Sequence, residues 1–92
     1  MIVRIMGEGQ FEVPDRFVAE LNELDAALES AVAADDEPAF GKVLAYLLDR
    51  VRAYGTPVPD DMVVPSEAIL PQLDSTIADV RMLLGDEGLI PG

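Results

Sequence analysis

The sequence predicts an α+β fold: an N-terminal β-hairpin packed on an antiparallel pair of helices, followed by a short helix near the C-terminus. Three observations indicate this fold. A β-forming segment ends at a glycine-containing turn, two long stretches show helical apolar periodicity, and a proline-rich segment separates them from the last helix. A chain of 92 residues is expected to form one domain, residues 1–92, with a radius of gyration of about 12 Å.

The N-terminal hairpin is predicted from residues 1–13. Residues 1–6 are rich in β-forming types, residues 7–9 read Gly-Glu-Gly, and residues 10–13 alternate polar and apolar side chains. The two glycines can supply the positive φ that a tight turn needs. A phosphate-binding loop is disfavoured, because the third glycine of a dinucleotide fingerprint and the Gly-Lys-Ser/Thr ending of a P-loop are both missing.

The first helix is predicted over residues 15–33, with Asp15 as its N-cap after Pro14. Its apolar residues recur at alternating spacings of four and three, which places them on one face directed at a core. This face comprises Phe17, Leu21, Leu24, Leu28 and Ala31, with Val32 at its edge.

The second helix follows directly, because the run Asp-Asp-Glu-Pro at residues 35–38 supplies acids and a proline for a helix start. The same apolar period continues to Tyr54, Gly55 is the expected C′ residue, and Pro57 prevents continuation. A connection this short makes the two helices antiparallel neighbours.

The segment from residue 56 to residue 75 contains four prolines, which exclude a long helix. Residues 66–70 are suited to a short third strand beside the hairpin, which needs such support. Thr76 and Asp79 form the pattern of a capping box, so a short amphipathic helix is expected to begin there and to end at Gly85.

Composition excludes several classes of function. The chain has no histidine and no cysteine, so a Ser-His-Asp or Cys-His nucleophile, the usual zinc sites, haem and disulfides are not expected. The net charge of −12 disfavours direct binding to nucleic acid or anionic lipid. No signal peptide and no apolar run of about 20 residues are recognised, so a cytoplasmic protein without a cofactor is expected.

Acidic residues adjoin one another at residues 35–37, 60–61 and 86–87. Clustered carboxylates can bind Ca²⁺ or Mg²⁺ or act as an acid–base pair, which keeps a metal-dependent enzyme as an alternative. No calcium-loop pattern accompanies them, and helix starts and turns recruit acids without any catalytic role. Solvated caps and turns are therefore the favoured interpretation, and no catalytic or metal-binding residue is predicted.

A basic and aromatic strip is the most informative surface feature. Lys42, Tyr46 and Arg50 are spaced four residues apart and so share one outward side of the second helix. Tyrosine and arginine are frequent interface anchors, which makes the strip a candidate partner-binding surface. Alternatively, Arg50 stacks on Tyr46 or pairs with acids of the first helix and the strip has no partner.

Two further features admit both a functional and a structural interpretation. Leu89 and Ile90 lie between glycines near the end of the chain and either dock on a partner or fold back over the core. Ala19, Ala26 and Ala33 recur every seven residues on the first helix, which either permits close approach of another helix or reflects helix propensity alone.

The two ends of the chain and its middle resemble the PspA-associated (PspAA) family. The residues that carry this resemblance are the opening Met-Ile-Val-Arg-Ile-Met-Gly-Glu-Gly-Gln-Phe, the middle segments 55–57, 59–61 and 65–66, and the ending Leu-Gly-Asp-Glu-Gly-Leu-Ile-Pro-Gly. The resemblance covers essentially the whole chain and implies a small accessory partner of PspA/Vipp-type coiled-coil proteins in prokaryotic envelope stress. It supplies no catalytic residue.

Together these observations predict a non-catalytic binding module for a PspA-like coiled-coil protein, with membrane contact only through that partner. The expected partner-binding residues are Lys42, Tyr46, Arg50, Leu89 and Ile90. The alternative is a self-associating homodimer that pairs through its N-terminal strand or its alanine stripe.

Overall fold

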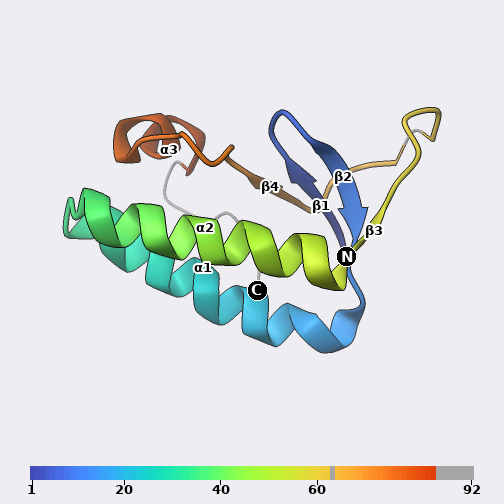
Figure 1. Cartoon of the computed structure of the whole chain (residues 1–92), viewed down its shortest axis with the longest axis horizontal. Coiled ribbons are helices and arrows are strands. Elements are labelled where there is room, and N and C mark those ends of the chain that lie inside the picture. Colours follow the sequence, from blue (N-terminus) through green and yellow to red (C-terminus); the bar gives the residue numbers. More distant parts are fainter. Residues whose placement is uncertain (63, 85–92) are drawn as a thin grey trace.

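The computed structural model describes residues 1–62 and 64–84, and it has an α+β architecture. Two long antiparallel helices lie along one face of a small mixed sheet, and a short third helix lies over the end where the two long helices connect (Figure 1). The sheet has four strands in the order β3-β2-β1-β4. The radius of gyration, 12.4 Å, agrees with the value expected for one domain.

The predicted hairpin is confirmed as strands β1 (Ile2–Ile5) and β2 (Gly9–Glu12). The strands are antiparallel, with Ile2 opposite Glu12 and Ile5 opposite Gly9. Gly7 and Gly9 have φ values of +86° and +119°, a region that side chains with a Cβ rarely adopt. The glycines of this segment therefore serve the turn, as predicted.

The first helix begins differently from the prediction. Residues Asp15–Phe17 form a 3-10 turn (η1), and α1 then runs over Val18–Ala33. The prediction of Asp15 as the N-cap was wrong, because its side chain caps neither η1 nor α1. Its carboxylate lies instead 3.6 Å from the N-terminal ammonium, whose nitrogen also donates to the carbonyl of Val13. Asp15 is 97% exposed, so this ion pair contributes little to stability.

The turn between the long helices combines a C-cap and an N-cap. Asp35 adopts a left-handed φ of 56°, and the N–H groups of Asp35 and Asp36 donate to the carbonyls of Val32 and Ala31. This is the Schellman arrangement that ends many helices. The side chain of Asp36 then accepts a hydrogen bond from the N–H of Ala39, so α2 (Glu37–Tyr54) begins at once.

Gly55 ends α2 for a reason other than the predicted one. Its backbone is extended, with φ −91° and ψ 158°, so it is not a left-handed C′ residue. Its Cα is instead closely approached, since a Cβ there would lie 2.8 Å from the carbonyl oxygen of Val51 and 2.9 Å from Cβ of Phe11. Glycine is required because the helix end passes tightly over β2.

Two strands complete the sheet. The predicted third strand is confirmed as β4 (Ala68–Leu70), which pairs in parallel with β1. A strand that the sequence pattern missed, β3 (Thr56–Pro57), pairs antiparallel with β2 at the opposite edge. Because β1 lies between β2 and β4, the N-terminal strand has no free edge for pairing with a second copy.

The capping box of α3 (Ile77–Leu84) is confirmed by two reciprocal hydrogen bonds. The N–H of Thr76 donates to the Asp79 carboxylate at 3.0 Å, and the N–H of Asp79 donates to the Thr76 hydroxyl at 3.2 Å. Arg81 anchors this helix on the turn between the long helices, because it donates to the carbonyl of Val32 and pairs with Asp35.

The core lies between the helix pair and the inner face of the sheet. Of the predicted α1 face, Leu21, Leu28, Ala31 and Val32 are buried, whereas Phe17 and Leu24 are half-buried. Asp25, which is 5% exposed, is a buried acid on the same helix that the apolar pattern does not indicate. The sheet, the two long helices and α3 all contribute large, fully buried side chains. These are Ile5, Leu21, Leu28, Phe40, Leu44, Leu47, Leu48, Leu70 and Ile77.

Candidate interaction surface

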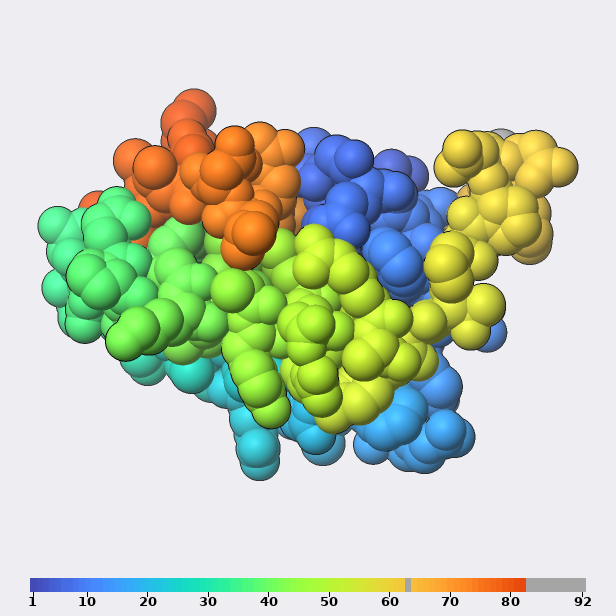
Figure 2. Space-filling model, viewed as in Figure 1, coloured from blue at the N-terminus to red at the C-terminus, as the bar shows by residue number. Residues whose placement is uncertain are grey.

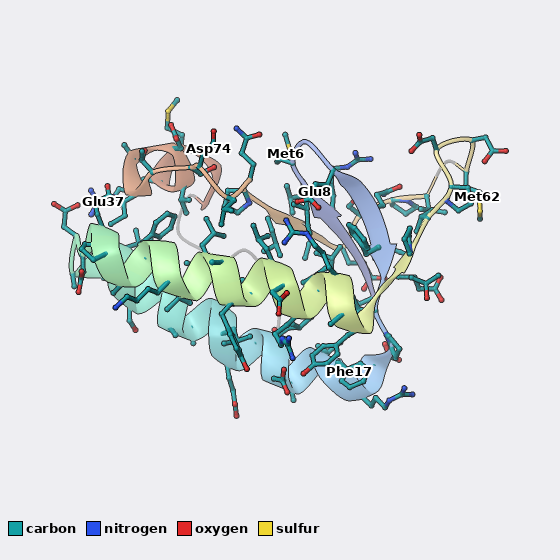
Figure 3. The ribbon with its side chains drawn as sticks, in the orientation of Figure 1. Met6, Glu8, Phe17, Glu37, Met62 and Asp74 are labelled. Carbon is teal, nitrogen blue, oxygen red and sulfur yellow. The ribbon has the colours of Figure 1, made fainter. Side chains whose placement is uncertain are left out.

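Aromatic and arginine side chains form a continuous column where the start of the first helix meets the end of the second. Phe17 of η1 stacks on Tyr54 of α2, with 4.0 Å between ring centroids and 7° between planes. Figure 3 shows Phe17 at this end of the helix pair, beside the last turn of α2. Antiparallel packing brings these two rings together, since one precedes α1 and the other ends α2.

Arginine side chains extend the stack at both ends. The guanidinium carbon of Arg16 lies 4.7 Å from the centroid of Phe17. The guanidinium of Arg50 lies 5.6 Å from the ring of Tyr54 and 5.3 Å from that of Tyr46. Distances of this size place the cations within reach of the ring quadrupoles. We refer to Arg16, Phe17, Tyr54, Arg50 and Tyr46 as the stacked column.

Acidic side chains hold the inner members of the column in place. The hydroxyl of Tyr54 donates to the carboxylate of Glu20 on α1 at 2.5 Å. Arg50 donates to the carboxylate of Asp49 at 2.5 Å, and its side chain is only 29% exposed. The column is therefore a preorganised structure and not a set of independent surface residues.

These contacts shift the ionisation of two members. The hydrogen bond that Arg50 donates to Asp49, with a smaller contribution from Tyr54, raises the pKa of Arg50 above its ordinary value, so the guanidinium stays charged. The hydrogen bond to Glu20, assisted by burial, raises the pKa of Tyr54 above 10.0, although Arg50 opposes the shift. Near neutral pH Arg50 is therefore a cation beside the neutral ring of Tyr54.

Only two of the three residues of the predicted strip belong to the column. Tyr46 and Arg50 come together as expected, and the stacking interpretation of Arg50 is confirmed, although its acidic partner is on its own helix. Lys42 and Tyr46 are exposed, the latter by 53%, and Lys42 forms no ion pair among the described residues. Leu89 and Ile90 lie outside the described residues.

Sequence reasoning missed three members of the column. Phe17 and Tyr54 were assigned to the apolar helix periodicity, and Arg16 was given no role. The available signal was their location, because the first residues of one helix and the last of its antiparallel neighbour must meet. Two of the six basic residues of the chain, Arg16 and Arg50, belong to the column in a molecule with net charge −12, and Lys42 lies eight residues before Arg50 on α2.

The described residues contain neither a cluster of metal ligands nor a membrane-spanning helix. Within residues 1–62 and 64–84, no group of three or more acidic side chains is arranged to hold a metal ion. None of the described helices is long and apolar enough to span a bilayer.

The alanine stripe of the first helix lies at the surface. The alanines at positions 19, 26 and 33 are all exposed on α1.

Comparison with known protein families identifies the chain. The model of the family described as PspA-Associated protein, PspAA, matches residues 1–92, which is the whole chain. The protein therefore belongs to the PspA-associated family, and the resemblance found in the sequence is confirmed. Neither the curated proteins nor the solved structures contain a match.

Proposed function

We propose that this member of the PspA-associated family is a non-catalytic accessory module that binds a PspA-like coiled-coil protein in the prokaryotic envelope stress response. The family name supports association with PspA. The stacked column supports a binding role, because it combines aromatic area with fixed cations on a strongly acidic molecule.

The column and Lys42 are the proposed contact for acidic side chains of the partner. Tyr46 supplies exposed aromatic area, and Arg16 and Lys42 supply cations that have no ion-pair partner among the described residues. Because Arg50 is already oriented by Asp49 and two rings, little side-chain freedom is lost there when a partner binds. Leu89 and Ile90 remain proposed as a second, apolar contact of the same module.

The protein is proposed to act in the cytoplasm and to reach the inner face of the membrane only through its partner. A net charge of −12 is repelled by the anionic lipids of that surface. A partner that itself binds the membrane can still hold this acidic domain near the lipid surface.

The first test is co-purification with the PspA homologue of the same organism, followed by light scattering and calorimetry on the complex. The informative variant is Lys42→Ala/Tyr46→Ala, which removes exposed groups and leaves Arg50 in place as a structural member of the column. We expect binding to weaken by at least about tenfold, or about 1.4 kcal/mol.

The matched control is Leu73→Ala/Met82→Ala, which truncates two exposed large side chains, 57% and 88% exposed, at the end of the molecule near α3. The control should bind as the wild-type protein does. Equal binding by both double variants would remove the column from the proposal. If the wild-type protein forms no complex and is a stable dimer, self-association is the better account.

A further inference from the structure

The sheet has an outer face that none of the three described α-helices covers. Val3 and Ile5 point to the core and are fully buried, so Ile2 and Arg4, which alternate with them, lie on the opposite side. The register places Glu12 opposite Ile2 and Gln10 opposite Arg4 on this outer face. Its covering comes instead from the segment that follows β3.

That segment forms an arch, defined here as residues 58–62 together with Val64. The side-chain amide of Gln10 donates to the carbonyl of Val64 at 2.9 Å and to the hydroxyl of Ser66 at 2.7 Å. The N–H of Val58 donates to the carbonyl of Gln10 at 2.9 Å. One residue of β2 thus anchors both ends of the arch, which stands out beside the hairpin in Figure 2.

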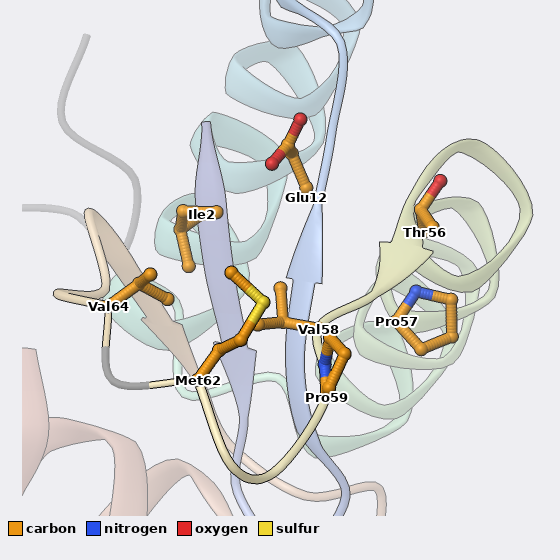
Figure 4. A pocket seen from close by; sticks show the side chains of 8 residues that line it. All are labelled: Ile2, Glu12, Thr56, Pro57, Val58, Pro59, Met62 and Val64. Atoms are coloured by element: carbon orange, nitrogen blue, oxygen red, sulfur yellow. The ribbon is translucent and has the colours of Figure 1, made fainter.

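A hollow of about 280 Å³ lies between the arch and the outer face of the sheet (Figure 4). This volume is slightly below the range of about 300–1,000 Å³ that is usual for small-molecule pockets and suits an aliphatic side chain. Met62 on the arch is 52% exposed, so the apolar wall is accessible from outside. The apolar lining residues are Ile2, Pro57, Val58, Pro59, Met62 and Val64.

The polar groups around the hollow are acidic. Glu12 lines it together with Thr56, and Asp60 and Asp61 lie exposed on the arch. None of these three carboxylates forms an ion pair among the described residues. Arg4 is the base of this outer face, and it lines a separate, smaller hollow with Asp60. Glu12 is exposed and forms no ion pair among the described residues, so its carboxylate is available to a cation of a binding partner.

We infer that this hollow receives an aliphatic side chain of the PspA-like partner, with a neighbouring Lys or Arg of the partner pairing with Glu12. The inference rests on the proposed function and adds a further contact, distinct from the column and from Leu89 and Ile90, to the same interface. Tyr54, a member of the column, and Thr56, which lines the hollow, flank Gly55, so both surfaces reach the end of α2. One is basic and the other acidic, and this difference fixes the orientation in which a partner docks.

The test measures the affinity for the PspA homologue with two hollow variants and two matched controls. Met62→Asp places a charge in the apolar wall, whereas Met82→Asp makes the same change at an 88% exposed position on α3. Glu12→Lys reverses the charge at the hollow, whereas Glu29→Lys reverses an exposed charge on α1. We expect each hollow variant to bind at least about tenfold more weakly and each control to stay within about twofold of wild type.

A second readout reports on the site itself. In ¹H–¹³C spectra of the labelled protein, the methyl signals of Ile2, Val58 and Val64 should shift when the PspA homologue is added. Wild-type affinity in Met62→Asp, or unshifted methyl signals, would overturn the inference and leave the proposed function intact. If only Glu12→Lys binds as tightly as wild type, then no Lys or Arg of the partner pairs with Glu12. Absence of binding by the wild-type protein would instead reject the proposed function.

Discussion

The ring of Phe17 lies parallel to the ring of Tyr54, with 4.0 Å between their centroids, and this contact joins the start of the first helix to the end of the second. The residues are 37 positions apart in the sequence and meet only because the helices are antiparallel. The same contact supports Arg50 and thereby Tyr46. Stability and the proposed binding surface are therefore coupled at one place.

Phe17→Leu tests this coupling, because leucine preserves an apolar side chain and removes the ring. We expect the free energy of unfolding to fall by about 0.5–1.5 kcal/mol, the usual value of an aromatic pair beyond its buried area. Urea denaturation measures the loss. Leu24→Ile is the control at another half-buried position of α1, and a Phe17→Leu protein as stable as that control would show that stacking contributes nothing.

The ionisation of Tyr54 offers a second test. Its pKa lies above the ordinary 10.0 because its hydroxyl donates to Glu20 and is partly desolvated. The folded state thus favours the neutral hydroxyl, so this contribution to stability is present below pH 10.0 and is lost as the pH rises through the folded pKa.

Ultraviolet titration of the Tyr46→Phe variant measures this pKa directly, because Tyr54 is then the sole tyrosine of the chain. Adding Glu20→Gln should return the pKa toward its ordinary value. A midpoint at or below 10.0 in the parent variant would contradict the hydrogen bond to Glu20 as its main cause.

Gly55 and Gly41 form a matched pair of glycine-to-alanine tests. At Gly55 a Cβ would lie under 3.0 Å from two atoms, one of them a carbonyl oxygen, so Gly55→Ala should destabilise by about 1–3 kcal/mol. At Gly41, inside α2, a Cβ has nothing within 4 Å, so Gly41→Ala should stabilise by about 0.5–1 kcal/mol. Thermal and urea unfolding of both variants should therefore change in opposite directions.

The ion pair between Glu8 and Arg52 predicts a pH-dependent contribution. Arg52 on α2 donates from its Nε to the Glu8 carboxylate in the hairpin turn at 2.8 Å, and this hydrogen bond lowers the pKa of Glu8 below 4.5. The stabilisation is present above that ordinary value and is lost as the pH falls through the lower, folded pKa. Both side chains are more than a third exposed, so the contribution at neutral pH is below about 1 kcal/mol.

Glu8→Gln should accordingly be less stable than wild type in urea at neutral pH and nearly equal to it near about pH 3. Glu29→Gln, at an exposed position of α1, should show no such dependence. A deficit of Glu8→Gln that persists unchanged into acid would show that the mutation acts through packing.

The local elements were predictable because their signals are local. The apolar period of α2, the acids and proline at its start, and the reciprocal cap of Thr76 and Asp79 each depend on residues within a few positions of one another. The third strand was also predicted, although its parallel pairing with β1 is a long-range property.

The sequence by itself determined the order of the hairpin, the three helices and β4, most of the buried helix faces and the family. Tertiary structure alone decided where the termini of those elements meet. Asp15 pairs with the N-terminal ammonium, Gly55 passes tightly over β2, and Gln10 anchors the arch, and each contact joins segments that only the fold brings together. The apolar periodicity of a helix or strand indicates which side of it faces the core. The stacked column and the hollow arise instead from contacts between side chains that are far apart in the chain, and no local sequence pattern encodes such contacts.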